Sequence, residues 1–258
     1  MNDFADTEES DRALFNTIAA SYARKDIVRS CSLARRYQLL FAVEPVLRCL
    51  GVIDTIVDVG CGVAAPAQYL KGHYRRYMGI DQSEKLIAIA RVFNKGNDRA
   101  EFAAGNIRSM NLQKAIGDVV LVVGALHHMI GLDNVMESLI QLSKPGGFLV
   151  VVEPQDGNPV IQSLRFLRGI VDPSYSREQH FFSRQELVTL LARHGLCDVE
   201  TVYQGYLSTP FAQVVFPWQG LATPLSKVAI FMDKGFQRYL PKLVRRLSWN
   251  IVVRARFP

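Results

Sequence analysis

Short apolar segments alternate with helical patterns through the middle of the chain. Between the apolar segments, residues 83–93 and 134–143 carry apolar side chains at helical spacing. Several of the segments are almost continuous in Val, Ile and Leu, as in strands that are covered by helices on both faces. The pattern predicts a doubly wound, mostly parallel α/β sheet. Its strands are expected at residues 55–60, 77–81, 101–105, 118–124 and 147–154.

Helical patterns also precede and follow this region. Before the first strand, apolar residues at helical spacing predict two helices, the second of which ends at Gly51. Beyond residue 154 the alternation loosens, but Ser183 and Glu186 form a capping box that opens a further helix. Two late strands, 198–206 and 248–257, are expected to pair as a hairpin across a long insertion.

Charge and cysteine usage limit the partners of the chain. The acidic N-terminus, MNDFADTEESDRALF, does not resemble a signal peptide, so we expect a cytoplasmic protein. The four cysteines lack metal-ligand spacing, and no metal is expected. The net charge of +6 is local, because the chain from Lys227 onward carries +7 and the first 226 residues carry −1. A nucleic-acid partner is therefore not expected.

A glycine turn follows the first predicted strand. Residues 60–65, G-C-G-V-A-A, satisfy the looser form of the G-x-G-x-x-G/A dinucleotide pattern at the edge where open α/β sheets bind ligands. Both NAD and S-adenosylmethionine (SAM) fit such a turn. Asp58, two residues before Gly60, favours SAM, because a carboxylate there would repel a pyrophosphate and attract a cationic amino acid. Asp81, which ends the second strand, is expected to accept both hydroxyls of a ribose or, alternatively, to cap the next helix.

Five motifs in order along the chain carry a family resemblance. They are VDVGCG, GIDQSEKLIAIAR, GNIRSM, GALHHM and KPGGFLVVVEP. With them, residues 15–206 resemble the class I SAM-dependent methyltransferases of the small-molecule type. The resemblance implies a Rossmann-like, seven-stranded sheet of order 3-2-1-4-5-7-6 with an antiparallel last strand. It also implies one methyltransferase domain, 1–258, divided into an N-terminal helical cap (1–54), a SAM-binding core (55–154), a substrate-side segment (155–206), a helical insertion or lid (207–247) and a last strand (248–258).

The resemblance also assigns the cofactor contacts. The N-terminal segment FNTIAASYARKD is expected to fold over the cofactor, where Tyr22 either closes the pocket or packs in the core. The residues expected to bind SAM are Tyr22, Asp58, Gly60, Cys61, Gly62, Asp81, Gln82, Asn106, Ile107, Gly124 and Ala125.

Catalysis requires alignment and, for a hydroxyl acceptor, a base with a pKa near neutrality. His127 and His128 follow the fourth strand, where the sheet is expected to open toward the methyl group, and His128 is slightly preferred as the base. Either histidine could instead have a structural role. Glu153, after the fifth strand, is expected to assist. His180 lies on a segment that could cover the substrate, or is an ordinary buried or solvated histidine.

These observations predict a SAM-dependent methyltransferase. The expected acceptor is a small molecule, methylated at a hydroxyl of a sugar, a natural product or a lipid-linked intermediate. Neither an NPPY nor a DPPY motif for nucleobase amines occurs. The alternatives are an NAD-dependent oxidoreductase, which Asp58 and the lack of a Tyr-x-x-x-Lys motif disfavour, and a non-catalytic SAM-fold subunit that activates a partner.

The insertion leaves two interpretations open. No charged residue occurs between Thr201 and Ser226, but Pro210, Pro217 and Pro224 argue against a transmembrane helix. A cationic amphipathic segment follows. It could pack as a lid over the acceptor pocket with its cations in water, or it could rest on an anionic membrane.

Overall fold

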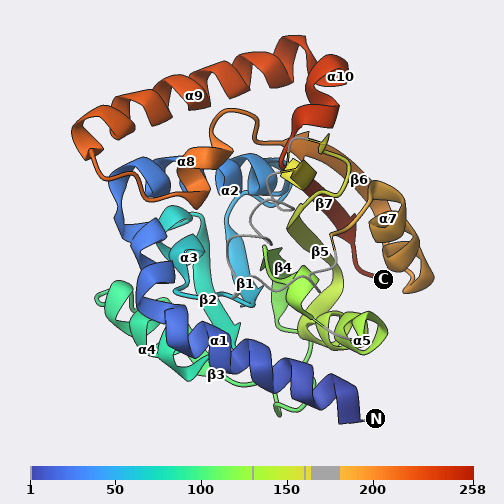
Figure 1. The fold of residues 1–258 in the computed structure, drawn as a ribbon. Coiled ribbons are helices and arrows are strands. Elements are labelled where there is room, and N and C mark those ends of the chain that lie inside the picture. Colours follow the sequence, from blue (N-terminus) through green and yellow to red (C-terminus); the bar gives the residue numbers. More distant parts are fainter. Residues whose placement is uncertain (1, 130, 160, 164–180) are drawn as a thin grey trace.

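The computed structural model describes residues 2–129, 131–159, 161–163 and 181–258 (Figure 1). Within these residues, seven strands form one sheet of order β3-β2-β1-β4-β5-β7-β6, which confirms the predicted order. The strands from β3 to β5 pair in parallel, whereas β7 is antiparallel to both β5 and β6, so the late hairpin is also confirmed. The strands are β1 Ile53–Val59, β2 Tyr74–Asp81, β3 Ala100–Ala104, β4 Gly117–Val123, β5 Ser143–Pro154, β6 Cys197–Gln204 and β7 Asn250–Arg256.

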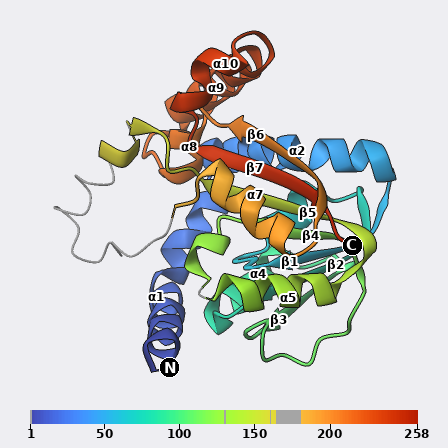
Figure 2. The same cartoon turned by 90° about the vertical axis from the view of Figure 1, so that its right-hand side faces the viewer.

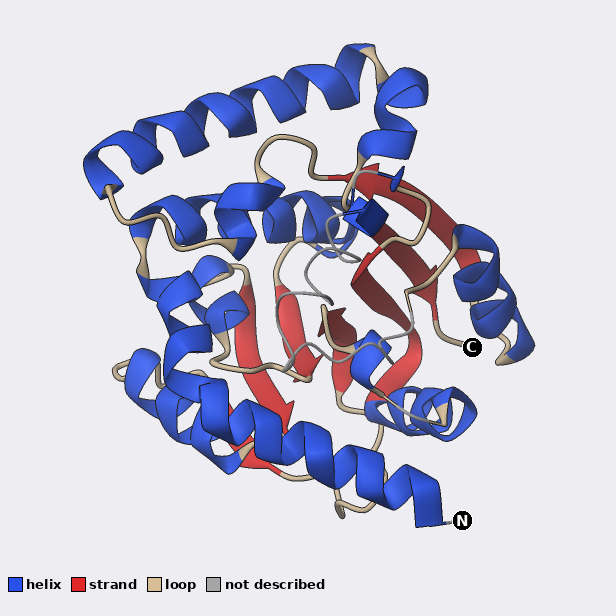
Figure 3. Cartoon of the chain, viewed as in Figure 1, coloured by secondary structure: helices blue, strands red, loops and turns tan. Residues whose placement is uncertain are grey.

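Helices cover both faces of the sheet (Figures 2 and 3). In β4, Val120 and Val122 pack toward α5 and α7, while Val119 and Leu121 pack toward α2, α3 and α4. Both faces of this strand are therefore buried, which explains its unbroken apolar run. The helices are α1 Asn2–Ile27, α2 Arg29–Leu50, α3 Ala65–Tyr69, α4 Glu84–Phe93, α5 Leu132–Leu142, α7 Arg184–Arg193, α8 Thr209–Gln213, α9 Gln219–Tyr239 and α10 Pro241–Val244, with 3₁₀ turns η1 Leu126–His128 and η2 Arg245–Leu247.

Side-chain caps fix the starts of two of these helices. Ser83 accepts a hydrogen bond from the backbone N–H of Leu86 at the start of α4. Ser183 and Glu186 form the predicted reciprocal capping box at the start of α7. Each cap supplies partners for backbone N–H groups that the first turn of a helix leaves unpaired.

The insertion folds into an additional helical layer. The long helix α9 packs on the outer side of α2, and α8 also packs on α2 (Figure 1). The buried carboxylate of Asp233 in α9 accepts hydrogen bonds from the backbone N–H groups of Tyr206, Leu207 and Ser208, and so ties α9 to the turn that follows β6. In the part of the chain that the structure describes, no helix combines the length and apolarity needed to cross a bilayer.

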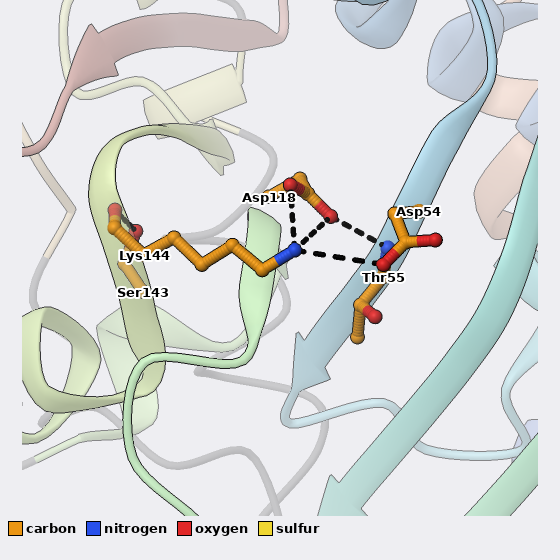
Figure 4. Close-up of polar contacts among 5 residues, drawn as sticks. All are labelled: Asp54, Thr55, Asp118, Ser143 and Lys144. Atoms are coloured by element: carbon orange, nitrogen blue, oxygen red, sulfur yellow. Dashed lines mark hydrogen bonds and ion pairs between the residues drawn. The ribbon is translucent and has the colours of Figure 1, made fainter.

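An ion cluster joins the amino ends of β1, β4 and β5 (Figure 4). The Nζ atom of Lys144 lies 2.9 Å and 3.1 Å from the two carboxylate oxygens of Asp118 and 3.5 Å from Oδ2 of Asp54. Asp118 also accepts the backbone N–H of Thr55 at 2.8 Å. The hydrogen bond to Asp118 raises the pKa of Lys144. The cluster therefore lies at the amino ends of the strands, whereas the glycine turn follows the carboxyl end of β1.

We expect Lys144→Met to lower the free energy of unfolding by about 1 kcal/mol, because the variant loses a partly exposed ion pair. The folded chain holds the proton of the Lys144 ammonium group more tightly than the unfolded chain does. The stability difference between the parent protein and Lys144→Met should therefore persist at neutral pH and disappear as the pH rises through the raised pKa of Lys144. Urea unfolding at pH 7 and well above pH 10.5, the ordinary pKa of lysine, measures it. Equal stability of the two proteins at pH 7 would contradict a stabilising role for the cluster.

Candidate active site

A cavity opens at the carboxyl edge of the sheet. Its volume is about 770 Å³, including the part open to solvent. The walls come from α1 and from the turns that follow β1, β2, β3 and β4. They contain these residues of the predicted cofactor set: Tyr22, Gly60, Gly62, Asp81, Gln82, Asn106, Ile107, Gly124 and Ala125.

The glycine turn lies close to the side chains of Ala125 and Tyr22. Gly60 and Gly62 have φ values of +72° and +55°, which side chains of L residues rarely allow. A Cβ atom on Gly60 would collide with the side chain of Ala125 in the turn after β4. A Cβ atom on Gly62 would lie 3.4 Å from the ring of Tyr22 in α1. The glycines therefore keep open the space between these three elements.

Asp81 holds the glycine turn against the end of β2. Its carboxylate accepts the backbone N–H of Gly62 at 2.8 Å and that of Ser83 at 2.8 Å. Burial raises the pKa of Asp81, and these two hydrogen bonds and the nearby His128 oppose that effect. A carboxylate oxygen has two lone pairs, so Asp81 can still accept hydrogen bonds from a ligand in the cavity that it lines.

Asp58 and Cys61 of the predicted set do not line the cavity. Asp58 is fully paired within β1, opposite Gly79 and Leu121, so its side chain points into a face of the sheet and not off the end of the strand. There it is 1% exposed and accepts a hydrogen bond from the hydroxyl of Tyr77. The expectation that the Asp58 carboxylate points into the opening is therefore corrected: it lies behind the cavity wall.

Burial changes the protonation of Asp58. The pKa of Asp58 rises to about 7, chiefly through burial, while the hydrogen bond from Tyr77 opposes the rise. Among the described residues, buried Oδ1 of Asp58 has no hydrogen-bond partner. An unpaired buried oxygen disfavours the charged form of the carboxyl group.

Glu153 and His127 form a buried pair after β5 and β4. The Glu153 side chain is fully buried, and its Oε1 accepts the backbone N–H groups of Ala125 at 2.9 Å and Leu126 at 2.7 Å. Its Oε2 lies 2.6 Å from Nδ1 of His127. Because a carboxylate only accepts hydrogen bonds, Nδ1 of His127 is the donor in this contact, and the tautomer that carries its proton on Nδ1 has Nε2 as its acceptor.

His128 faces the cavity, unlike His127. Its ring contacts the ring edge of Phe15 at a centroid distance of 5.1 Å, and its Nδ1 lies 3.5 Å from Oδ2 of Asp11, so both neighbours come from α1. The rings of the two histidines are 4.1 Å apart. The ring of His127 also stacks on Phe181, with a centroid distance of 6.0 Å. His127 therefore does not line the cavity itself but lies next to His128, which does.

Three residues that line the cavity were not predicted, and the structure does not test the prediction for His180. The cavity wall also contains Phe15, Arg108 and Met129. Phe15 belongs to the N-terminal segment expected to fold over the cofactor, and Arg108 and Met129 lie in the motifs GNIRSM and GALHHM, although neither was predicted to contact the cofactor. His180 lies outside the described residues. Within the described ranges, no group of three or more His, Cys, Asp or Glu residues could hold a metal ion.

Comparison with known proteins identifies the core. Residues 57–151 match the family described as "Methyltransferase domain". The chain is 29% identical over 104 residues to the sterol 24-C-methyltransferase of Saccharomyces cerevisiae, which covers 39% of this chain and 27% of that protein. It is 22% identical over 143 residues to the demethylmenaquinone methyltransferase of Clavibacter sepedonicus, covering 55% of this chain and 56% of that protein. The chain thus spans between about a quarter and about half of the length of these relatives.

Solved structures match over a longer range. A SAM-dependent methyltransferase from Thermotoga maritima has a TM-score of 0.62 at 17% identity, covering 95% of this chain and 99% of that one. The match extends over nearly the whole of both chains, so the two proteins share a fold. Residues 57–151 therefore match a methyltransferase domain, and the chain has the fold of a solved SAM-dependent methyltransferase.

Proposed function

We propose that this chain transfers the methyl group of SAM to a hydroxyl of a small, largely apolar acceptor, with His127 as the base. The observation that carries this proposal is the hydrogen-bonded pair of Glu153 and His127. This pair lies next to His128, which lines the cavity. A histidine fixed by a buried carboxylate is the usual arrangement of a general base.

The residues around the cavity fit SAM. Asp81 offers a carboxylate to the ribose hydroxyls, and the turn of Gly60 and Gly62 leaves room for the methionine end. Ile107 and Val135 supply apolar contacts suited to an adenine ring. When bound, SAM supplies a methyl group on a positively charged sulfur. A nucleophile in line with the carbon–sulfur bond takes the methyl group, and S-adenosylhomocysteine leaves.

His127 would handle the acceptor's proton. The hydroxyl proton moves to Nε2 of His127 as the oxygen attacks, and the resulting imidazolium is stabilised by Glu153 at Nδ1. His128, the residue that the sequence slightly favoured, has a weaker carboxylate contact at 3.5 Å and faces the cofactor cavity. We therefore assign His128 to cofactor packing and His127 to proton transfer.

The names of the relatives support an apolar acceptor. Those of the yeast and Clavibacter proteins state a sterol and a demethylmenaquinone as their substrates. In this chain, Phe181 stacks on His127, and Phe15 and Met129 line the neighbouring cavity. Aromatic and apolar side chains around the base favour an acceptor that presents its hydroxyl from a ring or another apolar group.

Ligand binding tests the first part of the proposal. We expect SAM and S-adenosylhomocysteine to raise the melting temperature and NAD to leave it unchanged. Asp81→Ala should weaken SAM binding by about 10- to 100-fold, because a charged hydrogen-bond acceptor is lost. Glu101→Ala, at an exposed position of β3, is the matched control and should bind SAM like the parent protein. Stabilisation by NAD alone would support an oxidoreductase instead, and binding of neither ligand would support a non-catalytic subunit.

A further inference from the structure

The long helix α9 buries small side chains and exposes most of its large apolar ones. Ala222, Ser226 and Ala229 are buried against the rest of the protein, and the hydroxyl of Ser226 donates to the carbonyl oxygen of Ser30 in α2 at 2.8 Å. Phe231 is 77% exposed and Trp218, directly before the helix, is 76% exposed. An ordinary surface helix has the opposite arrangement, with its bulky apolar side chains against the core.

The exposed apolar residues form a continuous stripe along the helix. Their spacing of three, four and seven residues places them on one face of a helix. This apolar stripe consists of Trp218, Leu221, Leu225, Val228, Phe231, Met232 and Tyr239. A contiguous exposed apolar surface of this kind marks an interaction site. None of its residues lines the cavity, so the inference below does not depend on the proposed reaction.

Cations border the apolar stripe. Lys227, Lys234 and Arg238 are exposed and lie on one neighbouring face of α9, because they are seven and four residues apart. Lys242, Arg245 and Arg246 continue the positive charge beyond the end of the helix. The single acid of this segment, Asp233, is fully buried and paired with the turn after β6, so it does not offset this surface charge.

From this surface we infer that α9 docks the protein on an anionic membrane, with the apolar stripe in the lipid headgroup region and the cations on acidic headgroups. Apolar side chains next to Lys and Arg on one helix are the features of helices that lie in the plane of a membrane surface. A second copy of this chain fits less well, since a symmetric contact through the same face would place two rows of cations against each other.

Vesicle sedimentation of the full chain tests this inference. We expect binding to vesicles of phosphatidylcholine with about one third phosphatidylglycerol, little binding to phosphatidylcholine alone, and release as NaCl rises from about 0.05 M to about 0.5 M. The double variant Trp218→Ser/Phe231→Ser should bind at least about tenfold more weakly, as should Lys227→Glu/Arg238→Glu. Both changes replace exposed side chains, so the fold should persist, which circular dichroism would check.

Two control variants test whether any exposed apolar or charged residue would have the same effect on vesicle binding. Val92→Ser removes an apolar side chain that is 75% exposed on α4, and Lys95→Glu reverses an exposed charge just after it. Both should bind vesicles like the parent protein. The inference is overturned by a lack of binding to the anionic vesicles, by equal binding of the double variants and the controls, or by a dimer that the Trp218→Ser/Phe231→Ser change dissociates in light scattering.

Discussion

Replacing His127 with alanine is expected to lower kcat for methyl transfer by about 10²- to 10⁴-fold, the usual contribution of a general base. The dissociation constant for SAM should change little, because His127 does not line the cavity. Glu153→Gln should also lower kcat, since the ring of His127 loses the carboxylate that fixes its proton on Nδ1. Initial rates with a methyl acceptor and calorimetry with SAM measure the two effects separately.

His128→Ala provides the decisive comparison. Because His128 lines the cavity and contacts Phe15, its loss should weaken SAM binding, with a smaller effect on kcat at saturating SAM. His194→Ala is the matched control, because His194 bonds to the carbonyl oxygen of Leu190 in α7 and lies outside the cavity wall. A full loss of kcat in His128→Ala with normal rates in His127→Ala would reverse the two assignments. Circular dichroism of each variant would show whether the fold is retained.

The doubly wound sheet could be predicted from the sequence pattern, whereas the order of its strands followed from the family resemblance. Buried parallel strands leave unbroken apolar runs, as in β4, and the turn at Gly60 must be glycine because a side chain there would collide with Ala125. The start of β2 was missed, since Arg75 and Arg76 interrupt its apolar pattern although Tyr74 is fully buried. Local patterns report on burial more reliably than on strand ends.

The directions of side chains could not be predicted to the same extent. The sequence placed Asp58 at the edge of the sheet, but whether it points off the end or into a face depends on pairing with β2 and β4. Likewise, adjacent histidines have the same local sequence, and only the position of Glu153 distinguishes His127 from His128. In α9 the amphipathic pattern was visible, yet the small residues, and not the large ones, pack against α2.

Asp58→Asn is expected to change how stability depends on pH. The pKa of Asp58 is about 7 in the folded chain and about 3.8 without the protein environment. The folded chain therefore retains a proton that the unfolded chain releases between about pH 4 and pH 7, so the parent protein loses stability relative to Asp58→Asn as the pH rises through this window. Three pKa units correspond to about 4 kcal/mol in the free energy of unfolding.

Urea unfolding from pH 4 to pH 8 measures the difference in the free energy of unfolding between the parent protein and Asp58→Asn. A difference is needed because burial also raises the pKa values of Asp26 and Asp81, and subtraction removes whatever these groups contribute equally in both chains. Tyr77→Phe supplies a second test: it removes the hydrogen bond that lowers the pKa of Asp58, so the decline should continue above pH 7. A flat difference curve, or one that rises with pH, would show that the Asp58 carboxylate is charged and well solvated in the folded protein.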